Sequence, residues 1–540
     1  MDITYLGHAG FCVETSGVVV IVDPWLSSRG AFDSAWFQFP CNHHLAEYVQ
    51  RKLADASKER YVYISHEHKD HFDPEFLKSL RSRNFKFIVP RFRRPALRAA
   101  LAEVQCARVI DCSDGEEIPI SGGFIKLYVI DTELNRDSTL LIKANGCSFL
   151  DVNDCKIYDR LAAIAAEQGP VDVLAAQFSG ATWHPTCYSY SREIYESISK
   201  TKLSSKFETV ARSIEKVRPR VFLPSAGPPC FLDPTLFDLN FEPINIFPRA
   251  SMFTRFLDER LSGVPTVWPE MMPGDVLSAK TGGFLTRSRN QVSEAGFTSY
   301  LQAYAAARQG LFAQLQASAE ATSGSQVIER LGDELKGKLA GFMLHKRIDL
   351  PLYFALSDFA GTMLRIDFCN KNIDRVSQIS DGRCYSISAP AWQIKRVLEG
   401  HLTWEDFALT FRMRLKREPD LYQTLIQAFL IMEAEDLPWF CRRMLDMESN
   451  QSRLVVEAGG RRYAVDRFCP HEGVDLKEGW VDDAGYLVCA RHGWRFDLAN
   501  GGRCTTNGTS VHALLDEQWP EPSKASDLLD EPRPLRAASR

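Results

Sequence analysis

Apolar residues up to about position 270 follow the pattern of short strands that alternate with helices. Two strand-like runs, ITYLGHAGFCVET and VVVIVDPW, come first. RYVYISHEH then has the apolar centre of a buried strand and ends in charged residues, and a short helical pattern and the strand NFKFIVP follow it. Further runs of this kind lead to an amphipathic helical stretch and one more strand, RPRVFLPS. Strands that alternate with short helices predict a layered α/β domain over residues 1–272.

The pattern changes after this first domain. Residues 290–340 are rich in Ala, Gln and Glu with helical spacing, residues 349–369 alternate as strands do, and a long amphipathic stretch follows from AWQIKRV onward. We therefore predict an α+β middle region over residues 273–440. Its strand pair followed by EGHLTWEDF resembles sterol-carrier-like modules.

Composition argues against several classes of protein. The 540 residues carry a net charge of −5, so no broad basic field points to nucleic acid or anionic lipid. No apolar run approaches the roughly 20 residues that a membrane span needs, and MDITYLGHAGF begins as a strand rather than as a signal peptide. The 14 Cys show no disulfide spacing, which favours a reducing cytoplasm. Residues 519–540 are rich in Pro and polar residues, and we expect a flexible tail there.

Two Cys and two His stand in loops of a small β-rich domain that we predict over residues 450–518. The loop CPHEG supplies Cys469 and His471, and the loop CARHG supplies Cys489 and His492 after a gap of 17 residues. This set suits either a tetrahedral zinc ion or a [2Fe–2S] cluster with both His on one iron. Because each loop supplies one Cys and one His, the pattern favours the cluster.

These loops resemble those of Rieske ferredoxin domains. The resemblance rests on CPHEG, CARHGWRFD and the gap between them, and it points to the oxygenase type because no further Cys follows either ligand pair. It implies an all-β domain whose cluster transfers single electrons to a second redox metal. No dinucleotide-binding or flavin motif is present, so electrons must come from a ferredoxin- or cytochrome-type donor with its reductase.

A second group of ligand-type residues follows the buried strand RYVYI directly. The stretch SHEHKDH places His66, His68, Asp70 and His71 within six positions, although the chain has only 12 His. In layered α/β proteins, functional side chains collect in loops at the carboxyl ends of strands. The stretch therefore predicts a metal site in the first domain.

This stretch resembles the signature of the metallo-β-lactamase superfamily, and ITYLGHAGF with VIVDPW resembles the first hairpin of that fold. The resemblance implies an αββα sandwich and makes Asp154, in FLDVNDC, a metal-bridging ligand. Two loops in which the family has further His lack one here. Glu133 is the nearest substitute in the first loop, or a solvated acid, and His184 could replace the second His, or pack as an ordinary side chain. We expect His8 to orient the hairpin by hydrogen bonds.

Other charged residues near the stretch have two interpretations each. Glu67 and Asp73 could pass protons or hold the ligands, or be solvated. Arg91, Arg93 and Arg94 could clamp a phosphate, although a basic start of a helix is the simpler interpretation.

The donor atoms favour iron over zinc. A hydrolytic di-zinc site uses a full set of His to hold a hydroxide, whereas a site richer in carboxylate with open positions suits iron that activates oxygen. Zinc also cannot accept an electron from a Rieske centre. We expect a [2Fe–2S] Rieske cluster and one or two non-haem irons.

The pairing of both motifs resembles hydroxylases that convert an N-acetyl group on a nucleotide-activated sugar to N-glycolyl, the CMP-N-acetylneuraminate and UDP-N-acetylmuramate hydroxylases. YISHEHKDH, VNDC, QFSGA and LPSAG occur in that family's order, but the Rieske domain comes last here and first in the vertebrate sialate enzyme. The resemblance implies a cytoplasmic monooxygenase that uses O₂ and an external electron donor and could form a homo-oligomer. The alternatives are a Rieske oxygenase for another small molecule, a metallo-β-lactamase-fold hydrolase with zinc, or a non-catalytic electron carrier.

Overall fold

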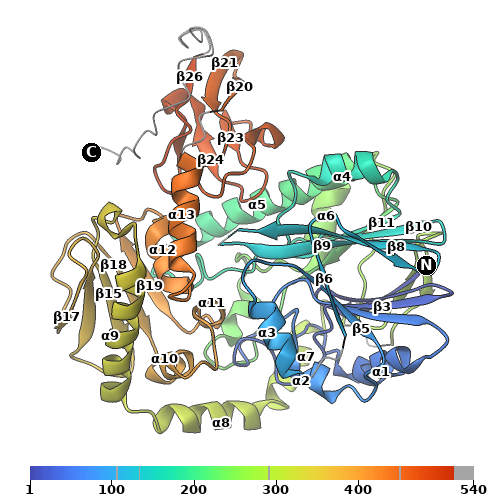
Figure 1. The fold of residues 1–540 in the computed structure, drawn as a ribbon, viewed down its shortest axis with the longest axis horizontal. Coiled ribbons are helices and arrows are strands. Elements are labelled where there is room, and N and C mark those ends of the chain that lie inside the picture. The colour runs from blue at the N-terminus through green and yellow to red at the C-terminus, as the bar shows by residue number, and fades with distance from the viewer. Residues whose placement is uncertain (105–107, 133, 290–291, 449–451, 516–540) are drawn as a thin grey trace. The chain divides into compact units, whose positions relative to one another are not determined.

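The structure is a computed structural model that describes residues 1–540 except 105–107, 133, 290–291, 449–451 and 516–540 (Figure 1). The described chain divides into two compact units. The first comprises Met1–Thr186, Tyr190–Ala317 and Leu409–Phe411, and the second comprises Cys187–Ser189, Ser318–Ala408 and the described residues from Arg412 onward. The domain bounds drawn from the sequence alone remain predictions.

The first unit contains an eight-stranded sheet in the order β14-β13-β1-β2-β3-β4-β5-β6. Its β3, β4, β5 and β6 pair in parallel, and β1, β2 and β3 form an antiparallel meander. The strands are β1 (Asp2–Gly7), β2 (Gly10–Glu14), β3 (Val18–Val22), β4 (Glu59–Tyr63), β5 (Lys86–Pro90), β6 (Val109–Cys112), β13 (Val276–Ser278) and β14 (Phe284–Thr286).

A second sheet of the same unit has six strands in the order β12-β11-β10-β9-β8-β7. Strands β10, β11 and β12 pair in parallel, and the remaining neighbours pair antiparallel. The strands are β7 (Glu117–Ile120), β8 (Gly123–Asp131), β9 (Arg136–Ala144), β10 (Cys147–Asp151), β11 (Val173–Gln177) and β12 (Val221–Ser225).

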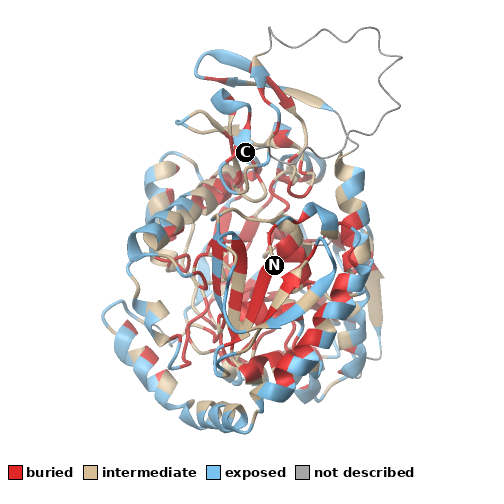
Figure 2. Ribbon diagram, turned by 90° about the vertical axis from the view of Figure 1, so that its left-hand side faces the viewer, coloured by how far each residue is buried: buried red, intermediate tan, exposed pale blue. Residues whose placement is uncertain are grey.

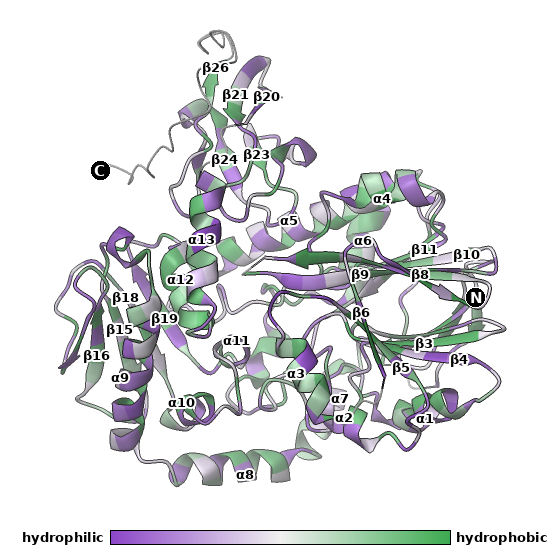
Figure 3. Cartoon of the chain, in the orientation of Figure 1, coloured by the Kyte–Doolittle hydropathy of each residue, from purple (hydrophilic) through white to green (hydrophobic). Residues whose placement is uncertain are grey.

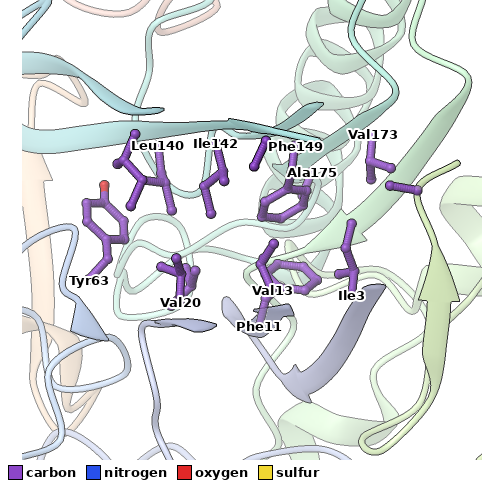
Figure 4. Close-up of a cluster of buried hydrophobic side chains, with 14 of the residues drawn as sticks. Ile3, Phe11, Val13, Val20, Tyr63, Leu140, Ile142, Phe149, Val173 and Ala175 are labelled. Carbon is purple, nitrogen blue, oxygen red and sulfur yellow. The ribbon is translucent and has the colours of Figure 1, made fainter. Parts of the chain in front are cut away.

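The two sheets face each other across one apolar core. In β3, Val18, Val20 and Val22 point into this core, while Val19 and Ile21 belong to a different cluster on the other face. Alternate residues of a strand point to opposite faces, so a strand that is apolar at every position must be covered on both sides. Figure 3 shows the apolar character of β3, and Figure 4 shows side chains of the two sheets directed toward one another.

Helices cover the outer face of each sheet. The first sheet packs against α1 (Ala46–Ala54), α2 (Pro74–Ser79) and α3 (Ala96–Glu103) through one buried cluster. The second sheet packs against α4 (Leu161–Gln168), α5 (Arg192–Val217) and α6 (Ala250–Arg260) through another. Figure 2 shows helices with buried residues on one side and exposed residues on the other. This αββα arrangement confirms the fold that the sequence predicts for the first domain.

Capping side chains define the ends of two of these helices. Asp73 accepts a hydrogen bond from the amide of Phe76 at the start of α2, and Pro74 follows it at the first helical position. Ser191 caps α5 in the same way, and Arg218 ends that helix with a φ of 49°. The described elements that remain in this part of the chain are η1 (His43–Leu45), η2 (Phe237–Phe241), α7 (Phe297–Ala306) and α8 (Gln309–Glu320).

The second unit begins with an α+β region built on a five-stranded sheet in the order β17-β16-β15-β18-β19. This content confirms the predicted α+β class of the middle region. Its elements are α9 (Gly324–Gly341), η3 (His345–Arg347), β15 (Leu352–Leu356), β16 (Met363–Asp367), β17 (Asn372–Val376), β18 (Cys384–Ala389), α10 (Ala391–Leu398), α11 (Trp404–Leu409), β19 (Arg414–Glu418), α12 (Thr424–Ile431) and α13 (Leu437–Glu448).

The second unit ends in a small β domain with its own apolar cluster. It has a three-stranded sheet, β20-β21-β26, and a four-stranded sheet, β22-β23-β24-β25. Its elements are β20 (Arg453–Ala458), β21 (Arg461–Asp466), η4 (Leu476–Glu478), β22 (Trp480–Val481), β23 (Tyr486–Val488), β24 (Arg495–Asp497), η5 (Leu498–Asn500), β25 (Arg503–Cys504) and β26 (Leu514–Leu515). Throughout the described chain, no helix is both long enough and apolar enough to cross a bilayer.

Candidate metal centres

The loop between β4 and α2 carries the predicted metal ligands of the first unit. Ring centroids of His66 lie 4.5 Å from His68 and 4.3 Å from His71, and Nε2 of His66 lies 2.8 Å from Nδ1 of His68. Nε2 of His71 lies 3.7 Å from Asp70 Oδ2 and 3.6 Å from Asp154 Oδ1. Asp154 comes from the loop after β10, so the fold brings a residue some 80 positions away to the same point.

Three atoms at the centre of this group are buried without hydrogen-bond partners. They are Nε2 of His71, Oδ1 of Asp70 and Oδ1 of Asp154. A buried polar atom that is left unsatisfied costs about 1–3 kcal/mol, and more when it is charged. Nitrogen and carboxylate oxygen are suitable ligands for iron or zinc, so these atoms fit a site for a metal ion. His66, His71 and Asp154 offer ligand atoms within 4.8 Å of one another.

The pKa values of these side chains show that the group favours positive charge. Burial lowers the pKa of His71, but the neighbouring Asp70 and Asp154 outweigh burial and raise that pKa well above its usual value. Burial raises the pKa of Asp70, while His71 and His8 outweigh it and lower the pKa below its usual range. Burial also raises the pKa of Asp154, and the neighbouring His71 outweighs burial and lowers that pKa below its usual value. The donor set therefore stabilises a cation at its centre.

Asp23, at the end of β3, holds one ligand from behind. Its Oδ2 lies 2.9 Å from Nδ1 of His71 and accepts hydrogen bonds from the hydroxyl of Ser65 and the side chain of Asn153. Its Oδ1 accepts a hydrogen bond from the amide of Ser65. This leaves Nε2 of His71 to face the centre, as in metal sites whose ligand His is oriented by a carboxylate. Nothing in the sequence singles out Asp23 beyond its place in VIVDPW.

Strand β9 supplies a second carboxylate that the sequence did not point to. Oδ1 of Asp137 lies 3.3 Å from Nδ1 of His66, and burial raises the pKa of Asp137 despite the opposing effect of His66. The neighbouring Arg136 donates to Glu67 over 3.3 Å, so Glu67 ties the ligand loop to β9 instead of being solvated. Glu133, a predicted ligand from this segment, lies outside the described residues.

His8 and Asp73 support the ligand loop. Nε2 of His8 lies 2.9 Å from Oδ2 of Asp70, and the carbonyl of His8 accepts hydrogen bonds from Tyr5 and Ala226. Asp73 accepts hydrogen bonds from the amides of Leu26 and Ser27 in addition to capping α2. His8 therefore holds the carboxylate of Asp70, and Asp73 fixes the end of the loop where α2 begins.

Two other candidates are engaged elsewhere. Nε2 of His184 lies 3.2 Å from the hydroxyl of Tyr190, and the carbonyl of His184 accepts a hydrogen bond from Lys202. Among the described residues, the groups able to share one ion do not include His184. Arg93 donates to Asp131 through its amide and side chain, which gives it a local structural role at the end of β8.

The two Cys/His loops of the second unit share one backbone pattern. The amide of Gly473 donates to the carbonyl of Cys469 over 2.8 Å, and the amide of Gly493 donates to the carbonyl of Cys489 over 2.9 Å. Both Gly residues have a positive φ, 70° and 66°, which a side chain would disfavour. Each turn therefore holds its Cys and its His in the same arrangement.

The ligand atoms of these loops converge. Nδ1 of His471 lies 3.3 Å from Nδ1 of His492, close to the separation of about 3.4 Å for two nitrogens on one tetrahedral ion at about 2.1 Å. Cys469 and Cys489 are 1% and 0% exposed. A hydrogen bond from Cys469 lowers the pKa of Cys489 well below its usual value. The donors thus separate into a thiol pair and an imidazole pair, which fits a cluster with unlike irons.

An aromatic residue fixes one of the imidazoles. The ring of His471 stacks on that of Trp494 at 4.1 Å with an interplanar angle of 12°, and Tyr422 meets both rings edge-on. Glu472 is buried beside the pair, with Oε2 3.4 Å from Nε2 of His492.

Family models match both parts of the chain. A Rieske [2Fe–2S] domain model matches residues 427–514, and a β-lactamase superfamily domain model matches residues 2–153. A putative Rieske 2Fe–2S iron–sulfur protein from Mycolicibacterium smegmatis is 28% identical over 529 residues, which are 94% of this chain and 98% of that protein.

Two further likenesses cover less of the chain. The cytidine monophosphate-N-acetylneuraminic acid hydroxylase of Asterias rubens is 24% identical over 242 residues, or 42% of this chain and 34% of that protein. The solved structure of CmlA, a diiron β-hydroxylase from Streptomyces venezuelae, is 16% identical over 50% of this chain and 53% of that chain, with a TM-score of 0.31. That structural likeness is too low to carry an argument.

The chain thus combines a metallo-β-lactamase-type domain with a C-terminal Rieske domain, as the sequence predicts. It is an oxidoreductase, because a Rieske domain transfers electrons. Its cofactors are a Rieske [2Fe–2S] cluster and non-haem iron, for which the buried His/Asp group provides suitable ligands.

Proposed function

We propose that this oxidoreductase is a monooxygenase that hydroxylates a small molecule with O₂ and electrons from an external donor. The buried group of His66, His71 and Asp154 carries the proposal, because it lies in a chain that also has a Rieske domain. A Rieske domain needs an acceptor for its electrons, and a metal site suited to iron provides one within the same chain. Zinc in that site would leave the electrons without an acceptor.

We assign the iron of the first unit to His66, His68, Asp70, His71 and Asp154. The short separations among these side chains and the unsatisfied atoms at their centre support the assignment. Whether one iron or two is held depends on further carboxylates, and Glu133 remains a proposal for this role. The contact of Asp137 with Nδ1 of His66 supports Asp137 as an orienting residue.

We assign the Rieske cluster to two unlike pairs of ligands. Cys469 and Cys489 bind one iron, and His471 and His492 bind the other through Nδ1. The 3.3 Å between the two Nδ1 atoms supports this assignment. A ferredoxin- or cytochrome-type protein with its reductase would supply electrons to the cluster.

The chain's own residues set the conditions of the reaction. When bound, the iron of the first unit supplies open coordination positions at which O₂ is reduced. Asp23 and Asp137 hold the rings of His71 and His66 at fixed orientations, and His8 holds the carboxylate of Asp70. The close packing of the sandwich beneath the ligands excludes water from one side of the site.

For the substrate we propose the N-acetyl group of a nucleotide-activated amino sugar, whose methyl becomes hydroxymethyl. The order of motifs along the chain and the likeness to the CMP-N-acetylneuraminic acid hydroxylase of Asterias rubens support this class. UDP-N-acetylmuramate and CMP-N-acetylneuraminate are the first compounds to examine. The resemblance also supports a cytoplasmic location, and no disulfide joins the cysteines that the structure describes.

The test is a reconstituted reaction with purified, iron-loaded protein, a ferredoxin with its reductase, NADH and O₂. The two nucleotide sugars would be supplied in parallel with UDP-N-acetylglucosamine, and the masses of the products would be measured by mass spectrometry. We expect one of them to gain a single oxygen atom in a reaction that stops without the ferredoxin. Hydrolysis without NADH, with zinc in the first site, would overturn the proposal.

A further inference from the structure

Lys206 is a half-buried residue near Asp154, and the proposed oxygen chemistry does not use its charge. It lies in the middle of α5, where its neighbours Phe207 and Val210 pack into the core beneath the second sheet. Its ammonium group reaches past that core to the carboxyl ends of β10 and β11. There it donates to the hydroxyl of Tyr158 over 2.9 Å and to Oε1 of Gln177 over 2.8 Å.

Both partners of Lys206 belong to the loops that build the metal site. Tyr158 follows Asp154 by four residues in the loop after β10. Gln177 is the last residue of β11, and its amide donates to the carbonyl of Asn153 over 3.2 Å. Asn153 in turn donates to Asp23, which orients His71. The ammonium group is therefore fixed in the layer of residues that surrounds the ligands.

The charge of Lys206 has no direct counter-ion among the described residues. Its two hydrogen-bond partners are neutral, and no carboxylate in that part of the chain forms an ion pair with it. Burial lowers its pKa to about 7, with the nearby Asp154 opposing this effect and Lys156 adding to it. When Asp154 binds a metal, its negative charge is shared with that metal, so its compensation of the charge of Lys206 weakens.

An ammonium group held between neutral partners is stabilised when an anion accepts its remaining hydrogen. Two of the three N–H bonds of Lys206 are used by Tyr158 and Gln177, which leaves one donor for a ligand. Charge-assisted hydrogen bonds from Lys are a common way to hold phosphate or carboxylate. The positive charge of Lys156 nearby would favour the same kind of ligand.

We propose that Lys206, held by Tyr158 and Gln177, binds an anionic group of the substrate, a phosphate or a carboxylate, next to the metal of the first unit. This deepens the proposed function and rests on it for the identity of the substrate, although the anion site itself does not depend on hydroxylation. Lys206 is a specificity-determining residue in this role. Its ammonium would distinguish a charged sugar derivative from a neutral one.

The experiment compares anion binding by the full chain and three variants. Lys206→Met removes the charge and keeps an unbranched side chain of similar length, Lys206→Arg keeps the charge, and Lys200→Met changes an exposed Lys on the same helix. Calorimetry would measure binding of inorganic phosphate, cytidine monophosphate and N-acetylneuraminate to protein loaded with iron under anaerobic conditions. Metal content and thermal unfolding would be measured on each sample.

We expect Lys206→Met to weaken binding of at least one anion by about tenfold to a hundredfold, the effect of one charge-assisted hydrogen bond. Lys206→Arg should stay within about threefold of the unchanged protein, and Lys200→Met should match it. Loss confined to phosphate and cytidine monophosphate assigns the site to a phosphate, and loss confined to N-acetylneuraminate assigns it to a carboxylate.

Two results would overturn the inference. One is equal binding of every anion by Lys206→Met and the unchanged protein, including the case in which neither binds. The other is a fall in metal content in Lys206→Met with anion binding unaltered, which would make Lys206 a structural support of Asp154. Anion binding that depends on Lys206 in a protein that hydroxylates nothing would refute the proposed function alone.

Discussion

The two metal centres are assembled in opposite ways. The centre of the first unit takes its residues from the β1–β2 turn, from the ends of β3, β4 and β10 and from β9. The Rieske centre takes its four predicted ligands from two short loops with the same pattern of hydrogen bonds. A centre built from many segments depends on the whole sandwich, whereas a centre built from two loops depends mainly on its own turns.

The two units also differ in the surroundings of their buried charged side chains. In the first unit His71 lies against the carboxylates of Asp23, Asp70 and Asp154, so opposite charges are in contact. In the second unit Lys338 is 1% exposed and lies over the rings of Trp404 and Phe429, and among the described residues it donates to the carbonyl of Leu430 over 3.4 Å. The first unit thus places opposite buried charges in contact around a functional centre, whereas the second packs one buried ammonium group against aromatic rings, with Glu433 and Glu334 near it.

The largest expected effect separates the two centres. We expect Cys469→Ser to abolish the visible absorption of the [2Fe–2S] cluster, because hydroxyl oxygen is a much poorer ligand than thiolate. The metal of the first unit should remain at its full content, because its ligands come from other loops. Metal analysis together with absorption spectra checks both statements.

Cys504→Ala is the matched control for this variant. Cys504 is 2% exposed in the same small domain, but it lies outside the two ligand loops. The variant should keep the cluster. A Cys469→Ser protein that retains a Rieske spectrum would contradict the ligand assignment.

Asp154→Ala is the reciprocal change. Its carboxylate faces Nε2 of His71 with an unsatisfied oxygen, so its removal takes away a ligand atom from the first centre. We expect the affinity for metal to fall by about a hundredfold or more, with the Rieske spectrum unchanged. Titration of metal-free protein with Fe²⁺ or Co²⁺ measures the affinity, and Asp2→Ala, at an exposed position of β1, serves as the control.

The same contrast explains how far the sequence alone could lead. His66, His68, Asp70 and His71 stand close together in the chain, and the Cys/His loops carry their spacing with them, so both groups are visible as motifs. Asp23 and Asp137 lie more than 40 positions from His71 or His66 and become neighbours only when the strands pair. No local pattern distinguishes them from other Asp residues at strand ends.

His184 shows the opposite case. Its place in the order of motifs allowed either a substitute ligand or an ordinary packed side chain, and its ring contacts Tyr190, six positions along the chain. A local contact of this kind depends on the turn that SGATWHP forms, which spacing does not reveal. The sandwich itself was predictable because strands such as β3 are apolar on both faces.

Lys338→Met tests the buried charge of the second unit. Burial lowers the pKa of Lys338 to about 7, although Glu433 and Glu334 oppose this effect. In the unfolded chain a Lys side chain has a pKa of about 10.4. Between these two pKa values the unfolded state binds more protons than the folded state. The buried charge therefore lowers the free energy of unfolding most below pH 7, and this destabilisation decreases as the pH rises. We expect the variant to be more stable at pH 7 by roughly 2–3 kcal/mol.

Urea unfolding at several pH values checks this expectation. The advantage of Lys338→Met should shrink by roughly 1.4 kcal/mol for each pH unit above 7, until it approaches the difference in packing alone. Lys336→Met, two positions away on an exposed part of α9, should show no such pH dependence. An advantage that stays constant from pH 6 to pH 9 would show that Lys338 carries no depressed pKa.

Asp23→Asn has the smallest expected effect on metal affinity. It tests most directly whether the first centre depends on residues from distant strands. The substitution keeps the size of the side chain and leaves one oxygen to accept from the amide of Ser65, but it removes the negative charge and the acceptor oxygen beside Nδ1 of His71. Because a carboxylate behind a ligand His raises its basicity and fixes its orientation, we expect the metal affinity of the first centre to fall about tenfold. Asp2→Asn should leave that affinity unchanged, and the Rieske potential should not move in either variant. If Asp23→Asn binds metal as tightly as the unchanged protein, then the carboxylate that β3 contributes does not support the first centre. The loop between β4 and α2 would then hold the metal without help from that strand, as each Rieske turn holds its own ligands.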